Sequence, residues 1–191
     1  MKFSLLPLLL LSLTLLWTGC KEDDPTVTTT LNYDGPNASA PQLPPGKNLF
    51  AAYFPPSETQ QYAGRTMDRI TFYLNSIPLT TTVVVYGEGP DDRTPGAELY
   101  RRDLTGRINN TEWIEDRLIP GIEITGEGLW LAVEVELADG EPFSVGCDAG
   151  RNYDPNGDLL LLSTSPGRWA TFNEINGERV NWNIRGVLAD E

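Results

Sequence analysis

Beyond residue 48, hydrophobic and polar side chains alternate along most of the chain, and this period of two predicts β-strands. The alternation is clearest in Asp68–Asn75 and Gly128–Leu137. The apolar positions of these two segments are Ile70, Phe72 and Leu74, then Leu129, Leu131, Val133, Val135 and Leu137. Turns containing glycine or proline recur roughly every 8 to 12 residues. We therefore expect strands with one face in a core and the other nominally polar. Trp130 lies on that second face, which either meets solvent or is covered by a loop that packs on Trp130.

Three further segments complete this prediction. Thr80–Tyr86 is a β-branched run typical of a central strand, and Asp158–Ser163 carries four consecutive leucines, as expected for a strand buried on both faces. Val180–Leu188 alternates again and suits a closing strand. No segment shows a sustained helical stripe. The pattern predicts an all-β protein, an antiparallel jelly-roll β-sandwich.

The segment before these strands has a different composition. Residues 21–48 contain prolines, threonines and small polar residues without apolar periodicity, which favours a tether or a loosely structured lead-in. Within it, Val27, Leu31 and Tyr33 are spaced like a short edge strand.

The first nineteen residues have the features of a secretory signal. Lys2 is followed by an apolar stretch, Leu5–Trp17, which at 13 residues is too short to span a bilayer core of about 30 Å. The following Thr18-Gly19-Cys20 resembles a bacterial lipobox, although Trp17 replaces the usual leucine. The resemblance implies cleavage before Cys20, lipidation of its thiol and a membrane anchor. The alternative is an ordinary free thiol. We expect a signal peptide at 1–19, a lipidated tether at 20–30 and a jelly-roll domain at 31–189.

An acidic run follows the cysteine. Lys21, Glu22, Asp23 and Asp24 resemble the export signal that Bacteroidota place after a lipidated cysteine. This implies an outer-membrane lipoprotein exposed on the cell surface. The alternative is a solvated acidic terminus.

Charge and cysteine content narrow the possible partners. The chain has a formal net charge of −13, and removing residues 1–19 takes away Lys2 and no acid, which leaves −14. A field of this sign repels nucleic acid, so we expect no nucleic-acid partner. The 172 residues from Cys20 onward suit one domain. Once Cys20 is lipidated, Cys147 has no disulfide partner and is expected to be a small buried hydrophobe.

The order of the aromatic segments resembles a known group of proteins. The segments are Phe50-Ala51-Ala52-Tyr53-Phe54, Tyr62-Ala63-Gly64, Glu112-Trp113, Leu118-Ile119-Pro120, Gly128-Leu129-Trp130-Leu131, Gly167-Arg168-Trp169 and Asn181-Trp182-Asn183-Ile184-Arg185-Gly186. They are similar to the jelly-roll modules of Bacteroidota surface proteins, which resemble cleaved-adhesin and MAM-like domains. The resemblance implies a non-catalytic, adhesive or ligand-binding role.

Enzyme chemistry has little support in the residue types present. The chain contains no histidine, which removes Ser-His-Asp and Cys-His nucleophiles and HExxH zinc sites. A glycoside hydrolase needs only two carboxylates, and Glu134 and Glu136 would lie about 7 Å apart on one strand face. A histidine-free glycoside hydrolase is therefore the weakest alternative, because a solvated acidic face explains the same spacing.

One oxygen-rich turn has spacing that suits a cation. Asp154, Asn156 and Asp158 alternate in sequence, and Asp148 is a possible fourth ligand. Three side-chain oxygens at this spacing suit Ca²⁺, although the glycine and distal glutamate of an EF-hand are missing. An Asx-rich turn without metal is the alternative.

Tryptophans provide the second binding candidate. Trp113, Trp130 and Trp169 lie beside carboxylates or turns, where exposed rings would stack on sugars, whereas Trp182 shares a core face with Ile184. The sequence thus predicts a surface protein that binds extracellular glycan or protein. The rival is a structural subunit that docks into an outer-membrane assembly through its acidic face or a strand edge.

Overall fold

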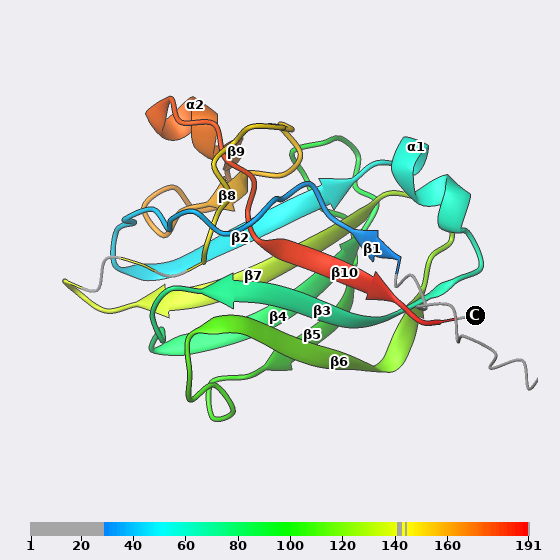
Figure 1. Ribbon diagram of the computed structural model, residues 1–191. Helices are drawn as coiled ribbons and strands as arrows, with labels where there is room; N and C mark the ends of the chain where they lie inside the picture. Colours follow the sequence, from blue (N-terminus) through cyan, green and yellow to red (C-terminus); the bar gives the residue numbers. More distant parts are fainter. Residues whose placement is uncertain (1–28, 141–142, 144, 191) are drawn as a thin grey trace, which may run out of the picture.

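The computed structural model describes residues 29–140, 143 and 145–190. Two antiparallel sheets pack face to face, so the predicted all-β sandwich is confirmed (Figure 1). The predicted signal peptide, Cys20 and the acidic run from Lys21 to Asp24 lie outside the described residues. Among the described residues, no helix is long and apolar enough to cross a membrane.

The first sheet has four strands in the order β1-β10-β3-β6. Their bounds are β1 Thr30–Leu31, β10 Ile184–Leu188, β3 Thr66–Leu74 and β6 Glu112–Glu123. The expected edge strand around Leu31 is present as β1, which pairs with β10. The predicted closing strand is β10, and it lies inside the sheet between the first strand and β3.

The second sheet has six strands in the order β5-β4-β7-β2-β8-β9. Their bounds are β5 Glu98–Asp103, β4 Thr80–Gly87, β7 Leu129–Leu137, β2 Gly46–Phe54, β8 Leu159–Leu161 and β9 Trp169–Thr171. The β-branched strand β4 lies between two others, as its composition predicted. The leucine run is only partly as expected, because Leu159 and Leu160 are buried whereas Leu161 and Leu162 are partly exposed.

The main core lies between the two sheets and contains the alternating apolar residues of β3 and β7. Trp182 lies within it, with ring contacts to Phe50 at 5.0 Å and Phe172 at 5.2 Å between centroids. Its indole Nε1 donates a hydrogen bond to the carbonyl of Leu159 at 2.8 Å. Because a buried indole is stabilised when its N–H has a partner, Trp182 suits a structural role.

A second apolar cluster lies on the outer face of the six-stranded sheet. Tyr53, Val84, Trp130, Ala132 and Leu159 are all buried there. Trp130 is 0% exposed, so packing, which was one of the two alternatives for it, is what the structure shows, and its candidacy as an exposed ligand-binding ring is wrong. The segment after β4 reaches this region through Glu88, whose carboxylate accepts a hydrogen bond from the Tyr53 hydroxyl at 2.9 Å. Period two distinguishes the faces of a strand, but it does not show whether the second face meets water or another layer.

Two short helices connect strands, and sequence periodicity missed both because neither spans two turns. They are α1 Pro56–Thr59, which continues into a 3₁₀ turn at Gln60–Tyr62, and α2 Phe172–Asn176. The second begins with a capping box in which Thr171 accepts from the Glu174 amide and Glu174 accepts from the Thr171 amide.

Candidate functional site

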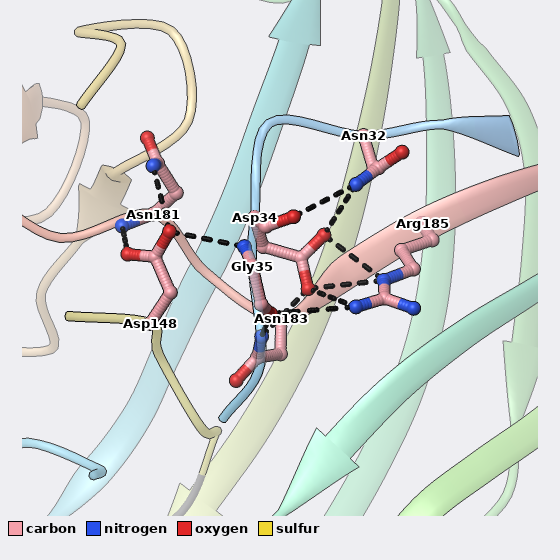
Figure 2. A network of polar contacts seen from close by, with 7 residues as sticks. All are labelled: Asn32, Asp34, Gly35, Asp148, Asn181, Asn183 and Arg185. Carbon is pink, nitrogen blue, oxygen red and sulfur yellow. Dashed lines mark hydrogen bonds and ion pairs between the residues drawn. The ribbon is translucent and has the colours of Figure 1, made fainter. Parts of the chain in front are cut away.

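Three polar side chains at and just before β10 organise the candidate site. Trp182 and Ile184 point into the core. Side chains alternate along an extended segment, so Asn181, Asn183 and Arg185 point to the opposite side. Each of these three binds a carboxylate from another part of the chain. We refer to Asn181, Asn183 and Arg185 as the β10 ladder (Figure 2).

Asp34 is the first carboxylate that the β10 ladder binds. Arg185 donates from Nε to both Asp34 oxygens at 3.0 Å and from Nη2 to Oδ2 at 2.8 Å. Asn183 donates to Oδ2 at 2.6 Å, and Asn32 donates to Oδ1 at 3.0 Å. The Asp34 side chain is 0% exposed, so a buried charge is fully paired here, in a forked geometry that favours arginine.

Asp148 is the second carboxylate, and it accepts four N–H groups. Oδ1 accepts from the amides of Gly150 at 2.9 Å and Asn181 at 2.8 Å. Oδ2 accepts from the Gly35 amide at 3.1 Å and from Asn181 Nδ2 at 3.0 Å. Burial alone would raise the pKa of Asp148, but the hydrogen bonds from Asn181, Gly150 and Gly35 outweigh it and lower that pKa. The carboxylate is therefore held in its ionised form.

These contacts also fix the lead-in to the sandwich. Asp34 and Gly35 are bound to the β10 ladder and to Asp148, and the amides of Ala38 and Ser39 donate to the carbonyl of Cys147. The prediction of a loose lead-in through residue 48 is therefore wrong for the described part of it. Hydrogen bonds, and not a periodic row of apolar side chains, hold this segment in place, so an apolar pattern could not reveal it.

A partly exposed aromatic lies next to the β10 ladder on the outer face of the four-stranded sheet. Trp113 of β6 is 39% exposed, and the guanidinium carbon of Arg185 lies 4.1 Å from its ring centroid. Tyr73, directly opposite on β3, meets the Trp113 ring edge to face at 5.6 Å. We call Trp113, Tyr73 and Arg185 the Trp113 platform. Its cation–π contact and its tyrosine neighbour hold the indole in one position.

A cavity of about 360 Å³ lies on the other side of Asp34. We call it the Asp34–Asp148 cavity, because both residues form part of its wall. Its apolar lining is Tyr33, Pro36, Ala38 and Ala149, and its other polar lining is Asn37, Arg151 and Asn152. The volume is at the lower end of the range of about 300–1,000 Å³ that ligand pockets occupy.

The cavity and the Trp113 platform adjoin. Asp34 lines the cavity and binds Arg185 of the platform directly. A Cβ on Gly146 would lie 2.3 Å from the amide oxygen of Asn37, a cavity residue, and 2.9 Å from the ring of Tyr73, a platform residue. Only glycine allows so close an approach. The two features are therefore neighbours, joined by the buried Asp34 and Gly146.

The three predicted ligand-binding tryptophans do not form one surface. Trp113 is exposed on the four-stranded sheet, Trp130 is buried, and Trp169 is half-buried on β9 of the other sheet, where its ring packs on Trp130 at 5.5 Å. Trp113 is the one that remains a candidate. Sequence reasoning missed its neighbours Tyr73 and Arg185, although the alternation of Asn181, Asn183 and Arg185 against core residues was visible.

The predicted Ca²⁺ ligands do not converge, and this prediction is wrong in geometry. Asp154 accepts from the amide of Asn156 at 2.8 Å, which is the Asx turn given as the alternative. Asp158 accepts a hydrogen bond from the amide of Asn173 at 3.0 Å, and Asp148 accepts from the four N–H groups described above. Among the described residues, no three Asp, Glu or Cys side chains gather as a metal site would require.

The remaining sequence candidates have ordinary neighbours. Glu134 lies 3.8 Å from the guanidinium of Arg101, and Glu136 accepts from the Thr80 hydroxyl at 3.3 Å. Cys147 is buried as predicted, its sulfur lies 3.3 Å from the Ser39 hydroxyl, and burial raises the pKa of its thiol. A thiol in this setting is a poor nucleophile at neutral pH.

Comparison with known proteins supports the fold only. No family model and no curated protein matches the sequence. The structure is similar to the clostridial cysteine protease Cwp84 after propeptide cleavage, with a TM-score of 0.52 and 11% identity over 86% of this chain and 40% of that chain. A structure of the cysteine protease and lectin-like domains of Cwp84, a surface layer associated protein of Clostridium difficile, gives a TM-score of 0.46 and 10% identity over 76% of this chain and 33% of that one. This chain thus spans less than half of either structure.

Proposed function

We propose that this protein is a non-catalytic binding protein, anchored to the outer membrane and exposed on the cell surface through a lipid on Cys20, and that its ligand is an extracellular glycan. The observation that carries the proposal is the Trp113 platform, an exposed indole held in place by its neighbours. The proposal agrees with the resemblance of the sequence to Bacteroidota surface modules.

The chemistry of the platform suits a sugar. The C–H face of a sugar ring stacks on an aromatic ring, while its hydroxyls need donors and acceptors close by. Arg185 uses Nε and Nη2 on Asp34, and its Nη1 has no hydrogen-bond partner among the described residues. The platform therefore combines a stacking surface with a free donor.

The platform is also held rigid before any ligand arrives. Arg185 is fixed by a buried carboxylate, and Trp113 is fixed by Arg185 and Tyr73. Less side-chain entropy is lost on binding when the contact groups are already ordered. Asp34 accepts five hydrogen-bond contacts and has a fully buried side chain, which supports a structural rather than a catalytic role for it.

We expect Trp113→Ala to weaken glycan binding strongly without unfolding the protein. The parent chain and the variant would be applied to an array of neutral and acidic glycans, in a zwitterionic detergent so that no alkyl glycoside competes. Leu99→Ala is the matched control, because Leu99 is an exposed apolar residue on the other sheet. An array on which the folded parent binds no glycan would overturn the proposal.

Anchoring is tested separately through the lipidated cysteine. We expect Cys20→Ser to leave the membrane fraction or remain uncleaved, because the serine oxygen does not accept the lipid that holds the mature chain in the bilayer. Fractionation of cells expressing the parent or the variant, followed by detergent phase partitioning, measures this. Equal processing and partitioning of both chains would contradict a lipid anchor.

A further inference from the structure

We propose that the Asp34–Asp148 cavity binds one neutral sugar unit of the glycan whose neighbouring unit stacks on Trp113. This inference rests on the proposed glycan-binding function and adds a specificity subsite to it. It assigns a ligand class to a cavity that sequence reasoning did not find.

The charges around the cavity favour a neutral ligand. Asp34 is neutralised by Arg185, and Asp148 has all its acceptor positions filled by N–H groups. Arg151 is the remaining charged side chain of the lining, and it forms no ion pair with the described residues. Its positive charge balances the negative charge of Asp148. A cation would have to displace existing hydrogen bonds, and a polyanion would meet a chain of net charge −13.

The uncommitted polar groups of the lining suit hydroxyls. The exposed side chains of Arg151 and Asn152 make no hydrogen bond with the described residues, so one amide and one guanidinium group remain available. The amide oxygen of Asn37 is buried and has no hydrogen-bond partner among the described residues. A hydroxyl both donates and accepts, and such a mixed set of groups matches it better than it matches a carboxylate alone. Several hydroxyls on one small ligand would satisfy these groups together.

The rest of the lining suits the carbon face of a sugar ring. The Tyr33 hydroxyl donates to the carbonyl of Tyr53 at 2.8 Å and lies 3.0 Å from Glu58, and the Tyr33 ring stacks on Phe54 with an interplanar angle of 4°. Because its hydroxyl already has hydrogen-bond partners, Tyr33 contributes an apolar surface to the cavity wall. Pro36, Ala38 and Ala149 extend this apolar wall.

The position of the cavity links it to the platform. Asp34 is shared between the cavity wall and Arg185, and Asn37 and Tyr73 approach the same glycine. One sugar chain can therefore contact both features. The platform supplies stacking that tolerates many sugars, whereas the concave cavity selects the unit that fits.

The experiment fills the cavity and leaves the platform unchanged. Ala149 is exposed and lines the cavity, so Ala149→Trp should block it while the sandwich still folds. Arg151→Ala removes the guanidinium group of the cavity lining that makes no hydrogen bond with the described residues. Arg168→Ala is the matched control, because Arg168 lines a different cavity of about 190 Å³. The full chain would be titrated by calorimetry with neutral oligosaccharides of glucose, galactose, mannose and N-acetylglucosamine, and with oligogalacturonate as the acidic probe.

We expect at least a tenfold loss of affinity for the best neutral oligosaccharide with Ala149→Trp, a smaller loss with Arg151→Ala and no change with Arg168→Ala. Circular dichroism and thermal melting would show that each variant is folded. Parental affinity in Ala149→Trp, together with lost binding in Trp113→Ala, would overturn the cavity subsite and leave the proposed function standing. Tighter binding of oligogalacturonate than of every neutral probe would overturn the neutral ligand class.

Discussion

Replacing Asp34 with alanine should lower the free energy of unfolding by roughly 3 kcal/mol, because it leaves Arg185 and Asn183 without the buried carboxylate that they both bind. The cost should be near the lower end of the range for broken buried pairs, since 29% of the Arg185 side chain is exposed and can reach water. For a domain of this size the melting temperature should fall by roughly 6 to 12 °C. Urea denaturation of the parent and the variant measures the difference.

Asp68→Ala is the matched control for this change. Asp68 pairs with Arg69 at 3.1 Å, but both side chains are partly exposed, and such pairs contribute about 0–1 kcal/mol. If both variants lost the same small amount of stability, the buried Asp34 pair would contribute no more to the free energy of unfolding than an exposed ion pair does. The Asp34 variant should also lose the fixed orientation of Trp113, which near-ultraviolet circular dichroism would report.

Replacing Asp158 with asparagine should change the free energy of unfolding differently at different pH values. The change should be about 4 kcal/mol more stabilising at pH 8 than at pH 4. Burial raises the pKa of Asp158 from 3.8 to about 7, although the hydrogen bond from the Asn173 amide partly opposes this. Well below pH 3.8 the carboxyl is neutral in both the folded and the unfolded chain. As the pH rises from 4 to 7, the unfolded chain ionises first, so the parent loses stability across this window.

Asparagine keeps an oxygen for the Asn173 amide and carries no charge, so Asp158→Asn should remove this pH dependence. Asp103→Asn is the control of opposite sign, because hydrogen bonds from Thr105 lower the pKa of that exposed carboxyl. Urea midpoints of the three chains would be compared at pH 4, 5.5, 7 and 8. Parallel curves for the parent and Asp158→Asn would contradict a raised pKa.

The strands were predictable because alternation is strong where one face packs into the core. Ile70, Phe72 and Leu74 all lie in that core, as their spacing indicated. The burial of Trp130 and Ala132 on the outer face of β7 could be given only as an alternative, because the acidic Glu134 lies on the same face. Local alternation carries no information about a distant segment that covers a face.

The candidate site was only partly predictable for a related reason. Trp113 was chosen from its acidic neighbour, and the structure leaves it exposed. Its partner Arg185 depends on Asp34, which lies 151 positions away in the sequence. The pairing of these two residues follows from the fold, which places the lead-in beside β10.

The most direct test of the glycan-binding proposal is the dissociation constant of the best array glycan for the parent and for Trp113→Ala, measured by calorimetry on the full chain. Loss of a central stacking ring typically costs about 2 kcal/mol or more, so the proposal predicts at least a roughly thirtyfold weaker affinity in the variant. Leu99→Ala should bind as the parent does. Equal affinity of the parent and a folded Trp113→Ala variant would contradict the Trp113 platform as the glycan-binding surface.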